Sequence, residues 1–161
     1  MKEQAMSKNT AIEKLKSGSI AITAICWLAV PFNLIIGFLQ FCDAQHLDIE
    51  TQLNKYMVYR SSLNNLIGAV IMAVAALLFA RIAKDGMPFT QKNFRSVRTI
   101  GILFLVNAVI PSVSAAGIIG TFKGVGGLVN PSAFMEGLLF LFIAHIIRYG
   151  TMLQQESDET L

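Results

Sequence analysis

The chain has 161 residues, of which 54% are hydrophobic and only 14% charged, with a net charge of +3. A soluble domain carries about 25% charged residues, so this composition excludes an ordinary soluble globular protein. The positive charges are also too few and too segregated to form a basic stripe for direct nucleic-acid binding. The apolar residues instead fall into blocks of roughly 20 residues, which is the length that crosses a bilayer as a helix.

The first apolar block, about 19–41, follows a lysine-containing tail, 1–18, and includes Pro31. This block is too long for the core of a signal peptide and has no small-residue cleavage site, so we interpret it as a membrane span. Cys26 and Cys42 lie on the same predicted helix, roughly 24 Å apart at 1.5 Å per residue, which is too far for a disulfide. We interpret both as small hydrophobic residues.

Three further spans are predicted at about 63–82, 99–120 and 132–148, followed by a tail, 149–161. Helices in lipid associate through close backbone approach, so small residues at helical spacing predict their contact faces. Such residues are Ala69, Ala73, Ala76 and Ala80 in the second span, Gly101, Ala108, Ser112 and Ala115 in the third, and Ala133, Gly137 and Ala144 in the fourth. The sequence therefore predicts one all-α domain, an integral membrane antiparallel four-helix bundle.

Lysine and arginine residues indicate the orientation of the bundle. Most of them lie in the tail 1–18, around the stretch 83–98 and at Arg148, while the segments between the other span ends contain only Lys55, Arg60 and Lys123. Because positively charged segments stay in the cytoplasm, this distribution predicts that both termini and the 83–98 stretch are cytoplasmic.

The predicted external segments offer a weak metal pattern. His46 lies near Asp43, Asp48 and Glu50, but a single histidine without ligand spacing favours a solvated loop over a zinc site. No cofactor or metal is expected. The second external segment is glycine-rich and ends in Asn130-Pro131, a helix N-cap followed by proline at the first helical position.

Polar residues within the outer halves of the spans predict an outward-facing polar cleft. Its candidate residues are Asn33, Asn64, Asn65, Ser112 and Glu136. Ionisable residues inside a membrane usually face the bundle interior or a wet cavity, which makes Glu136 a candidate ligand or proton site. The alternative is that Glu136 reaches interfacial water and is stabilised by its helix N-terminus. His145, near the inner end, is either an interfacial histidine or a pH-sensitive group.

The stretch 85–101, DGMPFTQKNFRSVRTIG, predicts a helix stop, a turn and a new helix. Gly86 can take the left-handed conformation that ends a helix, and Thr90 is a suitable N-cap for a helix that starts at Gln91. Lys92 and Arg95 would then face either anionic lipid headgroups or a soluble partner.

Two motifs carry a family resemblance. The turn Gly-x-Pro-Phe is followed by Arg98-Thr99-Ile100-Gly101, and the chain ends in IIRYGTMLQQESDETL, with Leu161 where valine is more usual. Their order and spacing across essentially the whole chain resemble the bacterial four-span membrane proteins of the domain of unknown function 2975 family. The resemblance implies a protein of the bacterial cytoplasmic membrane without an established catalytic activity. It also implies a partner, because genes of this family often accompany a small helix-turn-helix regulator.

We therefore expect a non-enzymatic interaction or sensory module. Its cytoplasmic partner surface would comprise Phe89, Lys92, Arg95, Asp158 and Thr160. The acidic tail would contact the partner, pair with the basic stretch or remain solvated. The alternative is a small transporter or immunity-type protein that uses the cleft around Glu136. An enzyme is not expected, because the chain has no Ser–His–Asp order, ligand cluster or phosphate loop.

Overall fold

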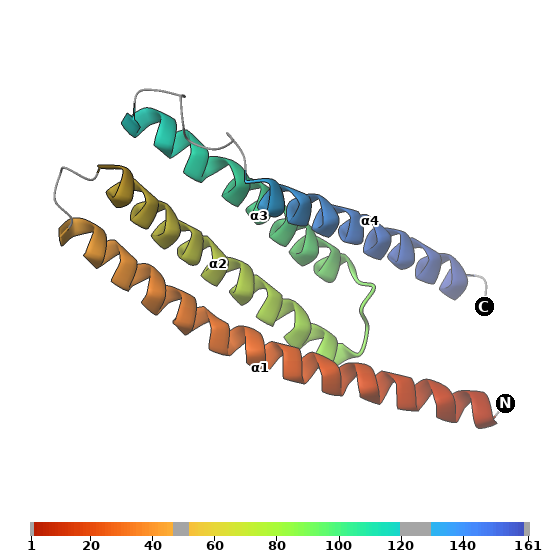
Figure 1. Cartoon of the computed structure of the whole chain (residues 1–161). Helices are drawn as coiled ribbons and strands as arrows, with labels where there is room; N and C mark the ends of the chain where they lie inside the picture. Colours follow the sequence, from red (N-terminus) through yellow and green to blue (C-terminus); the bar gives the residue numbers. More distant parts are fainter. Residues whose placement is uncertain (1, 47–51, 120–129, 160–161) are drawn as a thin grey trace.

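The protein is described by a computed structural model that covers residues 2–46, 52–119 and 130–159, with side chains for residues 10–45, 58–109, 130–157 and 159. Within these residues the chain forms four helices, α1 (Lys2–His46), α2 (Gln52–Asp85), α3 (Gln91–Ile119) and α4 (Pro131–Glu159) (Figure 1). The prediction of an all-α chain is confirmed for this part. All four helices are longer than their predicted spans, and α1 and α4 also include residues that were assigned to the tails.

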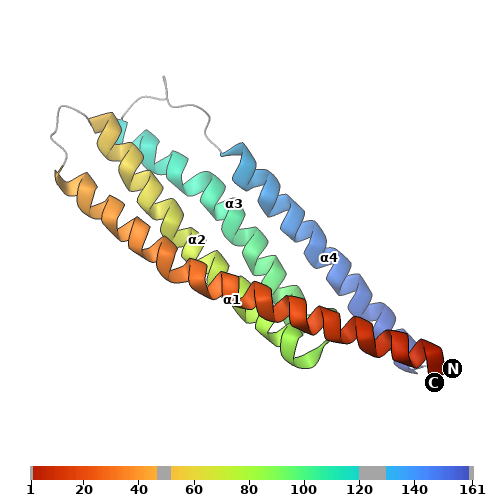
Figure 2. The ribbon, with the colours of Figure 1, turned by 60° about the horizontal axis from the view of Figure 1, so that its bottom comes forward.

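The helices run antiparallel and pack in chain order, α1 on α2, α2 on α3, and α3 on α4 (Figures 1 and 2). In the described part, the backbone of α1 does not come close to those of α3 and α4, and the backbone of α2 does not come close to that of α4. The helices therefore form a row, which is consistent with the predicted helical bundle, although α1 does not close it against α4 in the described part. Apolar burial gives little drive to close a bundle in lipid, where the tails are as apolar as the side chains.

The two ends of the row differ. α1 begins and α4 ends at the same end, where residues 86–90 join α2 to α3, and we call this the turn end (Figures 1 and 2). We call the opposite end, where α1 ends and α2 begins, the far end. α1 continues through Pro31 as a single helix, so this proline does not end the first predicted span.

Local capping signals set the helix boundaries as predicted. Gly86 has φ = +68° and donates its N–H to the carbonyl of Ile82 at 2.8 Å, which ends α2. The Thr90 hydroxyl accepts the N–H of Asn93 at 3.2 Å, which is an N-cap bond for α3. α4 begins at Pro131, directly after Asn130, whose backbone carbonyl accepts the N–H of Phe134 at 3.0 Å.

The core lies between α2, α3 and α4. Its buried residues are Ile71, Leu78, Ile82, Phe94, Val97, Ile100 and Ala144. Close backbone approach occurs where α3 crosses α4, because a methyl group at Gly137 would lie 3.0 Å from the carbonyl oxygen of Gly101. Both positions belong to the predicted small-residue faces, and Ala108 and Ala133 on the same two helices are also buried.

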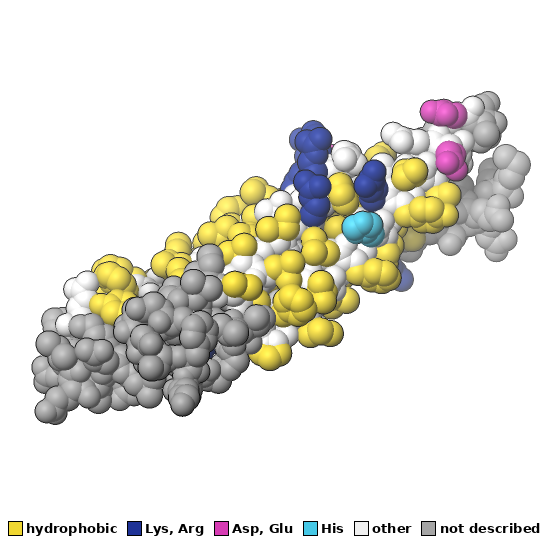
Figure 3. Space-filling view, turned by 90° about the horizontal axis from the view of Figure 1, so that it is seen from above, with side chains coloured by type: hydrophobic (Ala, Val, Ile, Leu, Met, Phe, Trp, Pro, Cys, Tyr) yellow, Lys and Arg dark blue, Asp and Glu magenta, His cyan; other side chains and the backbone are white. Residues whose placement is uncertain are grey.

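Three helices contain stretches that are long and apolar enough to cross a membrane, Thr10–Gln45, Val58–Asp85 and Pro131–Ser157. The third predicted span reaches residue 120, outside the described residues, and α3 is not among these three. Figure 3 shows a hydrophobic middle region, with Lys, Arg and His side chains towards the turn end and acidic side chains beyond them. This sequence of zones is typical of a chain that passes from lipid through headgroups into water.

Candidate functional site

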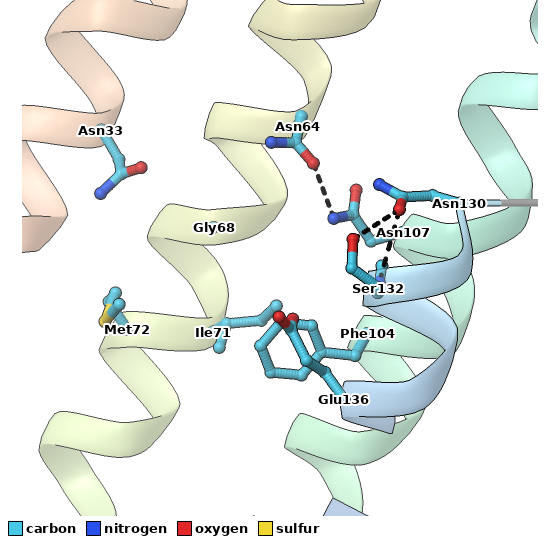
Figure 4. Close-up of a pocket in the computed structure, with 11 residues that line it drawn as sticks. Asn33, Asn64, Gly68, Ile71, Met72, Phe104, Asn107, Asn130, Ser132 and Glu136 are labelled. Atoms are coloured by element: carbon cyan, nitrogen blue, oxygen red, sulfur yellow. Dashed lines mark hydrogen bonds between the residues drawn. The ribbon is translucent and has the colours of Figure 1, made fainter. Parts of the chain in front are cut away.

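A pocket of about 280 Å³ lies towards the far end, and all four helical segments contribute to its lining. The lining residues are Asn33 from α1, Asn64, Gly68, Ile71 and Met72 from α2, Phe104 and Asn107 from α3, and Asn130, Ser132, Ala133 and Glu136 at the start of α4 (Figure 4). The structure thus brings together Asn33, Asn64 and Glu136 of the predicted cleft. It adds Asn107, Asn130 and Ser132, which were not predicted to line it.

Two of the predicted cleft residues are placed differently or remain outside the description. Asn65 does not line the pocket, because its side chain lies between α1 and α2 and donates to the Oε1 of Gln40 at 2.8 Å and to the carbonyl of Ser61 at 3.1 Å. The Ser62 hydroxyl donates to the carbonyl of Gly37 at 2.6 Å and joins the same two helices. Ser112 belongs to α3, but its side chain lies outside the described residues.

Hydrogen bonds across the pocket join α2 to α3 and fix the start of α4. The Asn107 Nδ2 donates to the Asn64 Oδ1 at 2.7 Å, so these two side chains bridge α2 and α3. The backbone N–H of Asn130 donates to the carbonyl of Ala108 at 3.0 Å, and the Ser132 hydroxyl donates to the Asn130 Oδ1 at 2.8 Å (Figure 4). The first turn of α4 is therefore anchored to α3 beside Asn107.

Asn107 is the most unusual group of the pocket. It is only 8% exposed, yet its Oδ1 is buried without a hydrogen-bond partner in the described part of the protein. A buried polar atom without a partner costs about 1–3 kcal/mol. The sequence signal was a lone asparagine in the middle of an apolar span, which we had not singled out.

Glu136 supplies the only formal charge among the lining residues. Its exposed side chain is directed from α4 towards α2 (Figure 4). It has no ion-pair or hydrogen-bond partner among the residues described here. Phe104, which lines the same wall, stacks on Phe140 with ring centroids 5.4 Å apart and an interplanar angle of 13°. The pocket therefore combines one carboxylate and several side-chain amides with aromatic and aliphatic walls.

The turn end contains the second candidate surface. Phe89 lies against α4, since a methyl group at Gly150 would be 2.6 Å from its Cδ1 atom. On the other side of the turn, a methyl group at Gly86 would be 2.8 Å from the Cε of Lys16 and 3.2 Å from the Cγ2 of Ile12 in α1. The turn is therefore held between α1 and α4, two helices whose backbones do not come close to each other in the described part.

The remaining residues of the predicted partner surface lie at or near this turn. Lys92 and Arg95 are exposed in the first turns of α3. Asp158 belongs to the last turn of α4, but its side chain is outside the described residues, and Thr160 lies outside them altogether. α4 is helical to Glu159, so most of the tail assigned to 149–161 extends the helix.

The structure gives little support for metal chemistry in its described part. Among these residues no group of three or more His, Cys, Asp or Glu side chains could hold a metal ion. The side chain of His46 lies outside the description. The exposed His145 places its Nδ1 3.0 Å from the carbonyl oxygen of Leu141, one turn earlier in the same helix. This contact explains the orientation of the ring without a bound metal.

Comparisons with known proteins give one result. A family model described as a protein of unknown function (DUF2975) matches residues 43–161. This match is narrower than the resemblance we expected, because it omits nearly all of α1 and with it Asn33. No curated protein and no solved structure matches the chain.

Proposed function

Because the chain belongs to the DUF2975 family, whose description names no activity, we propose that it is a non-enzymatic sensory or interaction module of the bacterial cytoplasmic membrane. It spans the membrane four times with both termini in the cytoplasm. At the turn end it binds a small helix-turn-helix regulator. The pocket towards the far end then opens on the external half of the membrane.

The observation that best supports this proposal is the position of the turn between α2 and α3. This turn lies between α1 and α4, and both of these helices extend beyond it (Figure 1). Contacts at Gly86 and Gly150 tie residues 86–90 to both α1 and α4, so three distant parts of the chain form one surface. Lys92 and Arg95 are exposed beside it. A partner that docks there would sense the relative position of α1 and α4, whose backbones do not come close to each other in the described residues.

Co-purification tests the partner surface. The full chain is isolated in a mild detergent together with a small helix-turn-helix regulator, chosen from the neighbouring genes. We expect Lys92→Glu and Arg95→Glu each to reduce regulator recovery at least tenfold, because a reversed charge repels the surface that the original charge attracted. Removal of the residues after Gly150 should have a similar effect.

Lys14→Glu is the matched control for charge reversal. Lys14 is exposed in α1, and it lies about 200° around that helix from Lys16, which contacts the turn. This variant should retain the regulator. Unchanged recovery in the truncated chain and in both charge-reversal variants at the turn would refute the proposed docking surface.

A second candidate function is a small transporter or immunity-type protein that uses the pocket. The observation that favours it is the lining itself, in which all four helical segments meet around Glu136 and Asn107. Such a site can change shape when α1 moves relative to α4. If Glu136→Gln left both uptake and resistance unchanged in cells that depend on the protein, this second function would be excluded.

A further inference from the structure

The contacts between α3 and α4 determine which of their side chains lie at the same level. A methyl group at Gly101 would lie 3.0 Å from the Cγ of Leu141, and a methyl group at Gly150 would lie 2.6 Å from the Cδ1 of Phe89. The two helices run antiparallel (Figure 1). The stretch of α3 that leads from Gly101 back towards Phe89 therefore lies beside the stretch of α4 from Leu141 to Gly150.

Three exposed side chains of these stretches are basic. Arg98 lies three residues before Gly101, whereas His145 and Arg148 lie four and seven residues after Leu141. Residues with these spacings share a helix face with the residue at the contact. All three are exposed, and we call them the cationic face.

The stacked rings of Phe104 and Phe140 show on which side of the contact the cationic face lies. The two rings meet across α3 and α4, with centroids 5.4 Å apart. At 3.6 residues per turn, Arg98 lies about 120° around α3 from Phe104, and His145 lies about 140° around α4 from Phe140. Both side chains therefore lie on the side of the contact opposite the stacked rings.

The guanidinium of Arg98 has a defined position on this side. Its Cζ lies 5.4 Å from the centroid of the Phe94 ring, which belongs to the core and is one helical turn closer to the turn end. The guanidinium is therefore level with the turn of α4 that contains His145 and Arg148. The axes of packed helices lie about 8–10 Å apart, a distance that two arginine side chains can span together. Both guanidinium groups can thus reach one ligand on this side of the contact.

No acidic side chain of these two helices lies near the cationic face. α3 contains no Asp or Glu, and α4 contains none between Glu136 and Glu156. At 1.5 Å per residue, these two carboxylates lie roughly 12 Å or more along α4 from His145 and Arg148. Within the described part of the chain, Arg98 and Arg148 have no ion-pair partner. The cationic face is therefore suited to a negatively charged ligand.

The surroundings of the cationic face favour a lipid over a free anion. Figure 3 looks onto the α3–α4 side of the row, where Lys, Arg and His side chains lie between a hydrophobic zone and acidic side chains. Ile102 and Phe142, about one turn from the cationic face towards the far end, are 47% and 65% exposed. Hydrocarbon chains attached to a bound phosphate would cover such side chains, which a free anion cannot do.

We infer that the cationic face binds the phosphate group of an anionic phospholipid whose acyl chains run along α3 and α4 towards the far end. Each arginine can donate two parallel N–H bonds to phosphate oxygens. A zwitterionic headgroup adds a positive group for which these helices have no nearby carboxylate, so it should bind more weakly. The inference requires neither a regulator at the turn nor a ligand in the pocket, and it holds for either orientation of the chain in the membrane.

Native mass spectrometry of the full chain tests this inference. The chain is purified in a mild detergent and mixed with equal amounts of phosphatidylglycerol, which is anionic, and phosphatidylcholine, which is zwitterionic, with identical acyl chains. The two lipids differ in mass, so the bound one is identified directly. We expect the first bound lipid to be phosphatidylglycerol about twentyfold more often than phosphatidylcholine, because each basic residue near a lipid surface contributes about a fivefold preference for negative charge.

Two variants and one control show where the lipid binds. Arg98→Gln and Arg148→Gln each keep a long polar side chain at an exposed position but remove its charge. Each should reduce the preference for phosphatidylglycerol about fivefold, and the double variant should lose it. Lys84→Gln removes one positive charge from an exposed position in the last turn of α2, outside the cationic face, and should retain the preference of the parent chain. Circular dichroism should show the same helix content in all variants.

Four results would overturn the inference. The first is equal binding of both lipids by the parent chain. The second is a full preference in the double variant, which would place the anionic lipid elsewhere. The third is a loss in Lys84→Gln as large as in the arginine variants, which would indicate attraction by the total charge of the turn end. The fourth is displacement of the lipid by inorganic phosphate beyond that caused by sodium chloride of equal ionic strength, which would indicate an anion site that needs no hydrocarbon chain.

Discussion

Asn93 organises the turn between α2 and α3 from a single buried position. It is 2% exposed, and its Nδ2 donates to the carbonyls of Met87 and Pro88, both at 3.1 Å. Its backbone N–H donates to the Thr90 hydroxyl. One side chain thus supplies hydrogen bonds to two carbonyls that lie between helices and have no helical partner. These bonds fix the position of Phe89 against α4.

Exchange of this amide for a carboxylate tests its role. Asn93→Asp preserves the shape but replaces the donor by an oxygen that faces two carbonyls. We expect a loss of about 1–3 kcal/mol or more of stability, which is the range for a buried polar group left unpaired. Thermal unfolding in detergent, followed by circular dichroism, would show this loss as a lower melting temperature.

Gln91→Glu is the matched control for that change. Gln91 is exposed at the first position of α3, where a negative charge is favoured by the helix dipole. The melting temperature should stay the same or rise slightly. If both variants melted like the parent chain, the hydrogen bonds of Asn93 would not hold the turn.

At the scale of elements, the crossing of α3 and α4 depends on the absence of side chains at two glycines. A methyl group at Gly137 would lie 2.7 Å from the Cδ2 of Leu105 and 3.0 Å from the carbonyl oxygen of Gly101. The leucine can move, but the backbone carbonyl cannot do so without separating the helices. This crossing lies near the pocket, so it also fixes the distance between Phe104 and Glu136.

We therefore expect Gly137→Ala to destabilise the pair of helices by about 1–3 kcal/mol, the usual cost of overpacking a close contact. The same change at Gly18 serves as its control, because a methyl group there would meet no atom within 4 Å. Alanine favours a helix over glycine by up to about 1 kcal/mol, so Gly18→Ala should be neutral or stabilising. Denaturant or thermal unfolding of both variants gives the comparison, and equal stability of the two would contradict it.

Helix boundaries could be predicted where the residues that set them lie close together in the sequence. Gly86, Thr90 and Asn130-Pro131 act within one helical turn, so the boundaries that they set were predicted correctly. The start of α2 at Gln52 and the continuation of α4 to Glu159 were not predicted, because hydropathy marks the apolar part of a helix and says nothing about its polar extensions.

The same reasoning explains the pocket. Polar residues in apolar spans correctly indicated Asn33, Asn64 and Glu136. Asn65 carries the same amide as Asn64, but its direction depends on how α1 rotates against α2, which sequence alone does not give. Asn107 was missed because its significance comes from an unpaired oxygen, and only the packed structure shows which atoms lack partners.

At the scale of the whole molecule, the topology can be measured without knowledge of the function. The distribution of lysine and arginine predicts that the turn end is cytoplasmic and that residues 121–130 are external. Single cysteines at Lys92 and Lys123, in a chain whose Cys26 and Cys42 are replaced by alanine, report on the two sides. A membrane-impermeant maleimide should label Lys123→Cys in intact cells.

Lys92→Cys should react only after the cells are opened. Labelling of Lys92→Cys in intact cells, with protection of Lys123→Cys, would show the inverted orientation. The pocket would then face the cytoplasmic half of the membrane, and a soluble regulator could not reach the turn.

α1 lies at the edge of the row, and it differs from the other three helices in its contacts and in its place relative to the family match. Among the other described helices its backbone comes close to α2 alone, it contributes only Asn33 to the pocket, and nearly all of it precedes the family match at 43–161. α2, α3 and α4 thus supply most of the pocket lining, and α1 forms one of its walls. A substitution at Asn33 can therefore change that wall without altering the core between α2, α3 and α4.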